Sequence, residues 1–223
     1  MAETVGPFVP NLRVFIVFSL CPASLRIRRS RNSTVHLPAR PASRGSDYSP
    51  RRECGEERCD TLAAMCTQPN PEFLRRAIQL ATQNVVTGAG GPFAALIVRG
   101  GAIVAEGVNT VTATHDPTAH AEVNAIRAAC KALGTFTLTG CELYASCQPC
   151  PMCLAAAWWA RIGAIYYGCS AADAAHAGFD DAFLYEEFRK DQYARSLPAT
   201  QLLGEEAWAS FAAWIASANK IEY

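Results

Sequence analysis

Four residues in two short motifs could support metal-assisted chemistry. His120 and Glu122 lie two positions apart, and Cys150 and Cys153 belong to a Pro-Cys-Pro-Met-Cys segment that follows 30 residues after the histidine. Cysteines three apart at a helix start point to the same face, and the positive end of that helix favours thiolate over thiol. With one imidazole added, the set offers three ligands suited to tetrahedral zinc and leaves one position for water.

The acidic residue next to the histidine suggests what such a site would do. Water bound to zinc ionises near neutral pH, whereas bulk water has a pKa of about 16. Glu122 can sit beside that water without ligating the metal, and a carboxylate there can move protons between water, a ring and a leaving group. The combined pattern matches the H-x-E…P-C-x-x-C signature of zinc nucleobase deaminases.

Each part of this pattern also has a simpler interpretation. A Cys-x-x-Cys pair alone could be redox-active, His120 alone could be a structural histidine, and Glu122 alone could be a first-turn helix charge. If Cys147 were a fourth ligand, the zinc site would be closed and only structural. Three other cysteines are expected to be small apolar core residues: Cys130, Cys141 and Cys169.

The elements that must position these motifs begin near residue 70. Asn70 followed by Pro71 is typical of a helix start, and apolar residues then recur at three- and four-residue spacing. Two apolar runs joined across Gly100–Gly101 predict a β-hairpin. The alternation that follows predicts an α/β fold, a mixed sheet with helices on both faces. The predicted order is helix 71–86, strands 93–99 and 102–108, helix 119–133, strand 141–145, helix 151–160, strand 164–167, helix 181–189, strand 201–203 and helix 205–219.

The net charge of zero is the sum of two segments of opposite charge. Residues 1–64 hold ten arginines, no lysine and six acidic residues, a net charge of +4, and residues 65–223 have a net charge of −4. Because residues 1–64 lack sustained apolar periodicity, we expect a disordered extension before a folded domain at 65–223. That extension could be an organellar transit segment, an unassigned tail, or sequence upstream of a true start at Met65.

Composition excludes several classes of protein. The 223 residues, half of them hydrophobic, suit one globular domain, and ten cysteines are too dilute for a disulfide-stapled miniprotein. The longest apolar run, 14–21, is too short for a bilayer span of roughly 20 residues, so no membrane association is expected. The acidic balance of 65–223 argues against a nucleic-acid partner.

Further motifs surround the zinc ligands. Gly-Gly-Pro-Phe at 90–93 and Pro-Thr-Ala-His-Ala-Glu at 117–122 occur together with Trp-Ala-Arg at 159–161, Gly-Phe-Asp-Asp at 178–181 and Asn-Lys-Ile-Glu-Tyr at 219–223. With these motifs, residues 71–223 resemble the cytidine deaminase superfamily and, within it, the small bacterial-type guanine deaminases. The first two motifs and the cysteine motif are largely shared with tRNA adenosine deaminases. Gln148 departs from the glutamate usual in the family.

The resemblance implies a three-layer α/β/α cytidine-deaminase-like fold around a mixed sheet of about five strands, and it assigns roles to individual residues. His120, Cys150 and Cys153 would hold one zinc ion per subunit. Glu122 would be the proton shuttle, and Asp181 would contact the polar edge of the purine and assist proton transfer. The remaining substrate contacts would be Asn109, Phe93, Ala121, Trp159 and Tyr223. The resemblance also implies a homodimer with an exchanged C-terminal segment, which would bring Tyr223 from the partner subunit.

The expected reaction is hydrolytic deamination of guanine to xanthine and ammonia, in which a zinc-bound hydroxide attacks C2 while Glu122 protonates the ring. Three alternatives stay open: a deaminase of guanosine or another aminated ring, a tRNA adenosine deaminase, and a non-catalytic zinc-stapled binding protein. Because the two cysteines must stay reduced to bind metal, we expect a cytoplasmic protein, or an organellar one if residues 1–64 are a transit segment.

Overall fold

The computed structural model describes residues 68–222, so the predictions for residues 1–64 and for Tyr223 lie outside the described part. The elements are α2 (Pro71–Val86), β1 (Ala94–Arg99), β2 (Ala102–Val108), α3 (Val111–Thr114), α4 (Ala121–Leu133), β3 (Cys141–Cys147), α5 (Pro151–Trp159), β4 (Ala164–Cys169), α6 (Ala171–His176), α7 (Asp181–Arg189), the 3-10 helix η1 (Gln192–Ala194) and α8 (Gly204–Ala216). Among the described residues, no helix has the length and apolar character that crossing a membrane requires.

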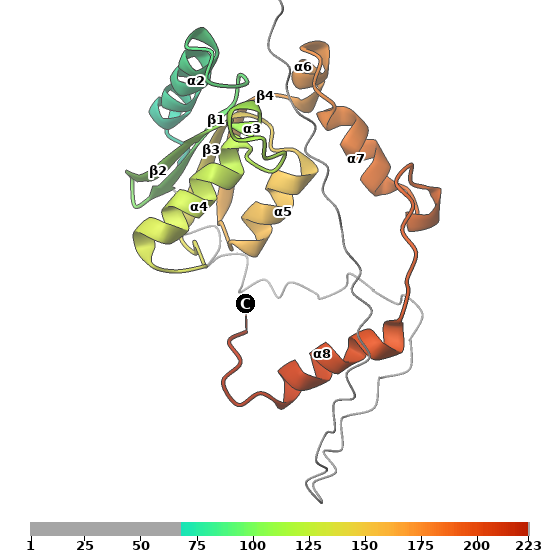
Figure 1. Ribbon diagram of the computed structural model, residues 1–223. Coiled ribbons are helices and arrows are strands. Elements are labelled where there is room, and N and C mark those ends of the chain that lie inside the picture. Colours follow the sequence, from blue (N-terminus) through green and yellow to red (C-terminus); the bar gives the residue numbers. More distant parts are fainter. Residues whose placement is uncertain (1–67, 223) are drawn as a thin grey trace, which may run out of the picture. The chain divides into compact units, whose positions relative to one another are not determined.

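Four strands form one mixed sheet in the order β2-β1-β3-β4 (Figure 1). β1 is antiparallel to both β2 and β3, whereas β3 and β4 run parallel. Gly100 and Gly101 connect β1 to β2 with φ values of 57° and 77°, the positive values that a tight hairpin turn needs. The predicted α/β fold with a mixed sheet is therefore confirmed.

The sheet holds four strands instead of about five, because the strand predicted at 201–203 is wrong. Residues 201–203 form neither strand nor helix. Leu203 has a φ of 52°, a left-handed conformation that cannot continue an extended strand, and α8 starts at the next residue. The apolar pair Leu202 and Leu203 is exposed there, so it does not contribute a sheet edge.

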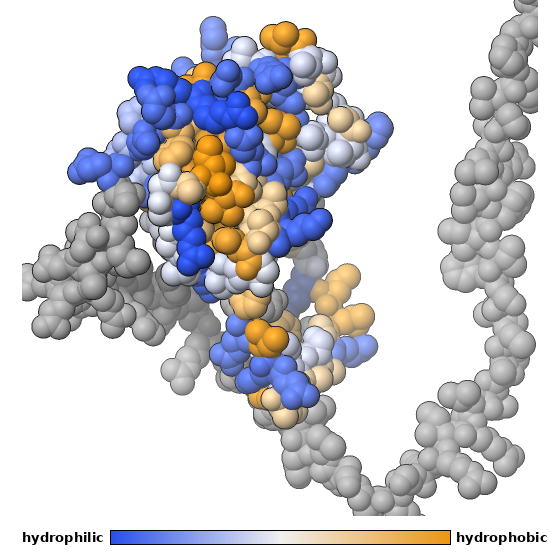
Figure 2. Space-filling model, turned by 90° about the vertical axis from the view of Figure 1, so that its left-hand side faces the viewer, coloured by the Kyte–Doolittle hydropathy of each residue, from blue (hydrophilic) through white to orange (hydrophobic). Residues whose placement is uncertain are grey.

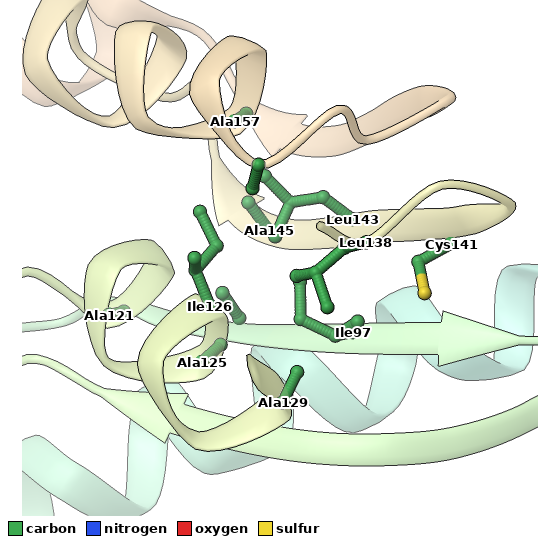
Figure 3. Close-up of a cluster of buried hydrophobic side chains, with 12 residues drawn as sticks. Ile97, Ala121, Ala125, Ile126, Ala129, Leu138, Cys141, Leu143, Ala145 and Ala157 are labelled. Carbon is green, nitrogen blue, oxygen red and sulfur yellow. The ribbon is translucent and has the colours of Figure 1, made fainter. Parts of the chain in front are cut away.

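Helices cover both faces of the sheet, with α2 on one face and α4 and α5 on the other (Figure 1). Successive strand side chains point to opposite faces. In β1, Leu96 and Val98 pack in the cluster under α2, whereas Ala95 and Ile97 pack in the cluster under α4 and α5. Figure 3 shows this second cluster, in which side chains of α4, β1, β3 and α5 meet. Both faces of the sheet are therefore buried.

The two helices that start at the chemical motifs begin at the ligand residues themselves. His120 is the N-cap of α4, and Cys150 is the N-cap of α5 with Pro151 in the first helical position. Gly107 in β2 permits a direct approach of α4, because a Cβ there would lie 2.3 Å from the Ala121 carbonyl oxygen. The start of α4 is thus held against the sheet backbone, which fixes His120 relative to the core.

The cysteines outside the motifs differ in burial. Cys141 is buried and Cys130 is half-buried, as predicted, but Cys169 is exposed. Cys169 is the last residue of β4, an edge strand with a neighbouring strand on one side only. The prediction of a core thiol at Cys169 is therefore wrong.

Candidate active site

The chemical motifs meet in a cavity of about 210 Å³ at the starts of α4 and α5. The wall of this cavity is completed by the turn before β1, the loop after β2 and the start of α7. Its lining residues are Gly91, Phe93, Asn109, Val111, Thr112, His120, Glu122, Gln148, Cys150, Phe179 and Asp181. A larger hollow of about 390 Å³ lies between the start of α2 and β4, but it contains no candidate metal ligand.

The three predicted metal ligands converge at one edge of the cavity. The Nδ1 atom of His120 lies 3.6 Å from the Sγ atoms of both Cys150 and Cys153. All three ligand atoms lie within 4.8 Å of one another, and within residues 68–222 they are the single group of this kind. Tetrahedral zinc, with bonds of roughly 2.0 Å to nitrogen and 2.3 Å to sulfur, places such ligand atoms about 3.5 Å apart. The spacing and the donor set therefore fit zinc.

Cys147 does not join these ligands. Its thiol contacts the Ser170 carbonyl oxygen at 3.6 Å, and it is not a member of the three-residue group. Burial raises the pKa of Cys147 to about 11, so it remains a neutral thiol. The alternative of a closed, four-ligand structural site is therefore wrong, and the geometry is that of a zinc site with an open coordination position.

The electrostatics of the two cysteines favour metal binding. Hydrogen bonds from Cys153 and then His120 lower the pKa of Cys150 to about 4. The interaction with Cys150, followed by burial, raises the pKa of Cys153, so Cys153 keeps its proton. The hydrogen bond to Cys150 likewise raises the pKa of His120. One sulfur is therefore a thiolate at neutral pH before any metal binds.

Glu122 is a buried carboxyl group beside this cluster. It is 6% exposed, and the thiol of Cys153 donates a hydrogen bond to its Oε2 at 3.4 Å. Burial raises the pKa of Glu122 to about 7. A carboxyl group poised near neutral pH can both accept and donate a proton, which is the property that a proton shuttle needs.

The opposite wall combines aromatic and polar groups. The rings of Phe93 and Phe179 pack edge to face with centroids 4.7 Å apart. Asn109 is 8% exposed and its Oδ1 accepts the Val111 N–H, whereas its Nδ2 has no hydrogen-bond partner within residues 68–222. Asp181 lies at the start of α7, and burial raises its pKa. The cavity thus offers an aromatic wall, an amide donor and a carboxyl group.

Two of the predicted substrate contacts within the described residues, Trp159 and Ala121, do not line this cavity. Trp159 is 62% exposed and lines hollows with the C-terminal residues Phe211, Trp214 and Glu222. It is the last residue of α5, so it lies roughly 13 Å along the helix axis from the Cys150 end. Ala121 is fully buried behind the cavity wall, and Tyr223 lies outside the described residues.

Several lining residues were missed by the sequence analysis. Val111 and Thr112 belong to α3, a four-residue helix with no side-chain cap and too short for periodicity to reveal. Phe179 belongs to the Gly-Phe-Asp-Asp motif, so its place in the cavity lining could have been predicted from that motif. Gln148 places a neutral amide in the wall, where its Oε1 accepts the Ala171 N–H at 3.1 Å.

The fold and the site define a class of zinc-dependent deaminase, and the comparison with protein families agrees. The family model described as the cytidine and deoxycytidylate deaminase zinc-binding region matches residues 67–169. A guanine deaminase from Bacillus subtilis (strain 168) is 54% identical over 151 residues, which are 68% of this chain and 97% of that protein. The chain therefore belongs to the cytidine deaminase superfamily of zinc-dependent deaminases and groups, within it, with the bacterial-type guanine deaminases.

A solved structure and a further relative support membership of the superfamily. The crystal structure of a Bacillus subtilis guanine deaminase aligns with a TM-score of 0.67 and 52% identity, covering 70% of this chain and 99% of that one. A tRNA-specific adenosine deaminase from Aquifex aeolicus (strain VF5) is 40% identical over 111 residues, half of this chain and 72% of that protein. The predicted three-layer cytidine-deaminase-like fold is confirmed by these matches, and so is zinc as its metal.

Proposed function

We propose that this chain catalyses the hydrolytic deamination of guanine to xanthine and ammonia. The observation that supports this best is the three-residue zinc site with the buried carboxyl group of Glu122 beside it, in a cavity sized for a small planar molecule. The 54% identity to a guanine deaminase, which extends over nearly that whole protein, favours guanine over other aminated rings.

In the proposed mechanism, His120, Cys150 and Cys153 hold the zinc ion. Bound zinc lowers the pKa of a coordinated water toward 7, which makes hydroxide available at neutral pH. The thiolate at Cys150 prepares the site for the cation, and the position of His120 at the start of α4 fixes the imidazole. Each of these residues therefore serves to hold the metal at the edge of the purine pocket.

Glu122 moves the protons of the reaction. Its carboxylate takes the proton of the water that attacks C2 and delivers it to the adjacent ring nitrogen N3. It then takes the remaining proton of the new C2 hydroxyl group and gives it to the amine, so that the C2–N bond breaks, ammonia leaves and the C2 carbonyl of xanthine forms. Because burial raises the pKa of Glu122 to about 7, the same carboxyl group can accept a proton in one step and donate it in the next.

The other lining residues orient the base. Phe93 and Phe179, whose rings pack edge to face, present an aromatic wall against which a purine ring packs. The free Nδ2 of Asn109 donates to a purine acceptor, and Asp181 accepts from a purine N–H and assists proton transfer. Ala121 does not line the cavity with its side chain. Its proposed contact with the base is through its backbone, since the first N–H groups of a helix have no intrahelical partner.

The C-terminal segment suggests how Tyr223 joins a site and what packs on Trp159. α8 makes no extensive contact with another helix or strand of the described part, yet Phe211, Trp214 and Ile215 expose 60%, 42% and 49% of their surface. Apolar side chains are visible on this helix in the lower part of Figure 2. Because such a stripe is normally buried, we propose a homodimer in which C-terminal segments are exchanged. In that assembly Tyr223 closes the purine pocket of the partner subunit, and Trp159, which lines a hollow with Phe211 and Trp214, packs against a C-terminal segment.

Sedimentation velocity tests the dimer. The parent protein is expected to sediment as a dimer, and a Phe211→Ser/Ile215→Ser double variant as a monomer with an unchanged zinc content. Exposed Phe183→Ser on α7 serves as the control and keeps the parent's oligomeric state. A parent protein that is monomeric at micromolar concentration would rule out the exchange.

The proposed enzyme corresponds to residues 65–223, with residues 1–64 as an extension outside the deaminase domain. The family match begins at residue 67 and the first described helix at Pro71, which supports this boundary. The need for reduced zinc-binding thiols suits a cytoplasmic location.

Ammonia release from a panel of substrates tests the function. Guanine, guanosine, adenine, cytosine and a tRNA are offered to the zinc-loaded protein, and we expect turnover of guanine at least a hundredfold above the others. Comparable turnover of guanosine would extend the substrate class to nucleosides, and exclusive turnover of the tRNA would overturn the proposal.

A further inference from the structure

Asn84 is a buried polar side chain of α2 that the mechanism above does not use. It lies in the last turn of α2 and is 5% exposed. Its Nδ2 donates two hydrogen bonds of 2.9 Å, to the carbonyl oxygens of Gly91 and Asn109. Both acceptor residues line the candidate active site. Asn84 therefore binds two residues of the cavity lining but does not itself line the cavity.

The two carbonyls belong to segments far apart in the chain. Gly91 lies in the turn before β1, and Asn109 is the first residue after β2. The backbone carbonyl of Asn84 also accepts the N–H groups of Ala89 and Gly90, which closes the turn after α2. Asn84 thus ties the end of α2, the turn before β1 and the loop after β2 to one another.

The packing around this junction is tight. A Cβ at Gly90 would lie 2.1 Å from the Asn109 carbonyl oxygen and 2.9 Å from Asn84 Nδ2. The glycine backbone therefore lies directly against the same carbonyl that Asn84 binds. If the amide donor were lost, the Gly91 carbonyl would still accept the Phe93 N–H at 2.8 Å, but the buried Asn109 carbonyl would lose the Asn84 donor, and the loop after β2 would shift to satisfy it.

The position of the Asn109 backbone determines where its side chain points. Its N–H donates to the Phe93 carbonyl at 3.0 Å, and its Oδ1 accepts the Val111 N–H at 3.2 Å. Within residues 68–222, Nδ2 forms no hydrogen bond, and Asn109 lines the cavity. On the other side, Asn124 Nδ2 donates to the Val108 carbonyl at 2.9 Å and anchors the loop to α4. Loss of Asn84 would therefore move the loop but leave it attached.

We propose that Asn84 is a positioning residue that sets the Asn109 carboxamide for purine binding, an inference that rests on the proposed role of Asn109 as a substrate contact. Asn84 acts through backbone carbonyls and is separate from the zinc ligands. Its loss should therefore weaken substrate binding while the metal stays bound, because displacement of a binding group by a fraction of an ångström disturbs the bound geometry.

Steady-state kinetics of Asn84→Leu test this proposal. Leucine matches asparagine in size and removes the donor. We expect KM for guanine to rise roughly tenfold, with kcat within about threefold of the parent and one zinc per chain retained. Gln83→Ala, an exposed neighbour on the same helix, is the matched control and should leave both constants unchanged. Assays are run well below the melting temperature of each variant, so that a purely structural role of Asn84 would leave KM unchanged.

A double-variant cycle separates this inference from the proposed function. If Asn84 acts through Asn109, the Asn84→Leu/Asn109→Ala protein should have a KM within about twofold of Asn109→Ala alone. If the KM increases of the two single variants simply multiplied in the double variant, the inference would be overturned. It would also be overturned if Asn109→Ala raised KM and Asn84→Leu did not. An unchanged KM in Asn109→Ala would instead overturn the role of Asn109 itself.

A second substitution covers the case in which Asn84→Leu does not fold. Asn84→Asp keeps the size of the side chain but replaces the donor by an acceptor that faces the two carbonyl oxygens. At neutral pH, the same rise in KM and the same non-additivity with Asn109→Ala are expected. An Asn84→Asp protein with the parent's KM would count against the proposal.

Discussion

Residues 68–169, which hold the metal ligands, are packed differently from residues 170–222. In the first part, Leu96, Ile97 and Leu143 are 0% exposed, and both faces of the sheet are covered. In the second part, α6, α7 and α8 follow one another without a sheet, and large apolar side chains such as Phe188 and Phe211 are about 60% exposed. Only the first part has a continuous hydrophobic core.

Contacts of the second part with the cavity are few and specific. Phe179 packs on Phe93, and the Tyr185 hydroxyl donates to the Pro149 carbonyl oxygen at 2.6 Å. These contacts bring Asp181 to the cavity without touching the zinc ligands. The difference suggests that metal binding depends on the first part alone, whereas enclosure of the substrate depends on the second. Substitutions in each part can test this separation.

The largest effect is expected from Cys153→Ala. Two remaining protein ligands make a poor zinc site, so zinc and all activity should be lost, and the melting temperature should fall. Atomic absorption after gel filtration measures the zinc, and calorimetry the melting temperature. Cys169→Ala, an exposed cysteine of β4, is the control and should keep one zinc per chain. A full zinc content in Cys153→Ala would remove this residue from the site.

Glu122→Gln should lower kcat nearly as much while leaving the metal in place. The amide cannot accept the proton of the attacking water, and loss of such a group costs about a hundred- to ten-thousandfold. Zinc content and stability should match the parent, in contrast with Cys153→Ala. Glu186→Gln on the exposed face of α7 is the control. Turnover within tenfold of the parent would exclude Glu122 as the proton shuttle.

Tyr185→Phe breaks a contact between the two parts and should have a moderate effect. One hydrogen bond contributes about 1 kcal/mol, so α7 would be held less firmly and KM for guanine should rise severalfold. The zinc content should not change, because Tyr185 lies outside the ligand set. Tyr193→Phe removes a hydroxyl from a residue that is 84% exposed and should have no effect. Loss of zinc in Tyr185→Phe would contradict the separation of the two parts.

The smallest effect concerns the acid stability of the second part. Glu187 accepts hydrogen bonds from Lys190 and from the N–H and hydroxyl of Ser196, and the bond from Lys190 is the main cause that lowers the pKa of Glu187 to about 2 from 4.5. A lowered pKa stabilises the fold above pH 4.5, and this contribution disappears as the pH falls toward 2.

Glu187→Gln removes that titration. Between pH 5 and pH 2, the variant's free energy of unfolding should therefore decline less steeply than the parent's, as measured by urea denaturation at each pH. Parallel declines in the two proteins would show that Glu187 does not contribute. Zinc binding at neutral pH should be the same in both.

Local signals in the sequence were sufficient for much of the first part. Asn70 and Pro71 define the start of α2, and the structure bears out the predicted range 71–86. The three candidate zinc ligands could be proposed from the sequence because their residue types and spacing have few other uses, and the structure brings them together. Their convergence follows from the fold, since a parallel β3–β4 pair and the α4 packing place two helix starts at the same edge.

The remaining features depend on packing that periodicity does not report. Asn84 lies on the buried side of the amphipathic helix α2. In the sequence, a polar residue there only interrupts the apolar pattern and does not reveal its hydrogen bonds. Trp159 follows the zinc motif in sequence, yet the length of α5 carries it away from the cavity. α6 was missed although Ser170 and Asp173 form a capping box, a signal that the sequence does contain.

The ligand positions at the two helix starts have a further consequence. His120 and Cys150 are both N-cap residues, and neither side chain forms a capping hydrogen bond. A zinc ion held there joins the beginnings of α4 and α5, which are 30 residues apart in the chain, in the way that a disulfide closes a loop. The metal is then a cross-link as well as a catalyst, so the resistance of the protein to proteolysis should follow the supply of zinc.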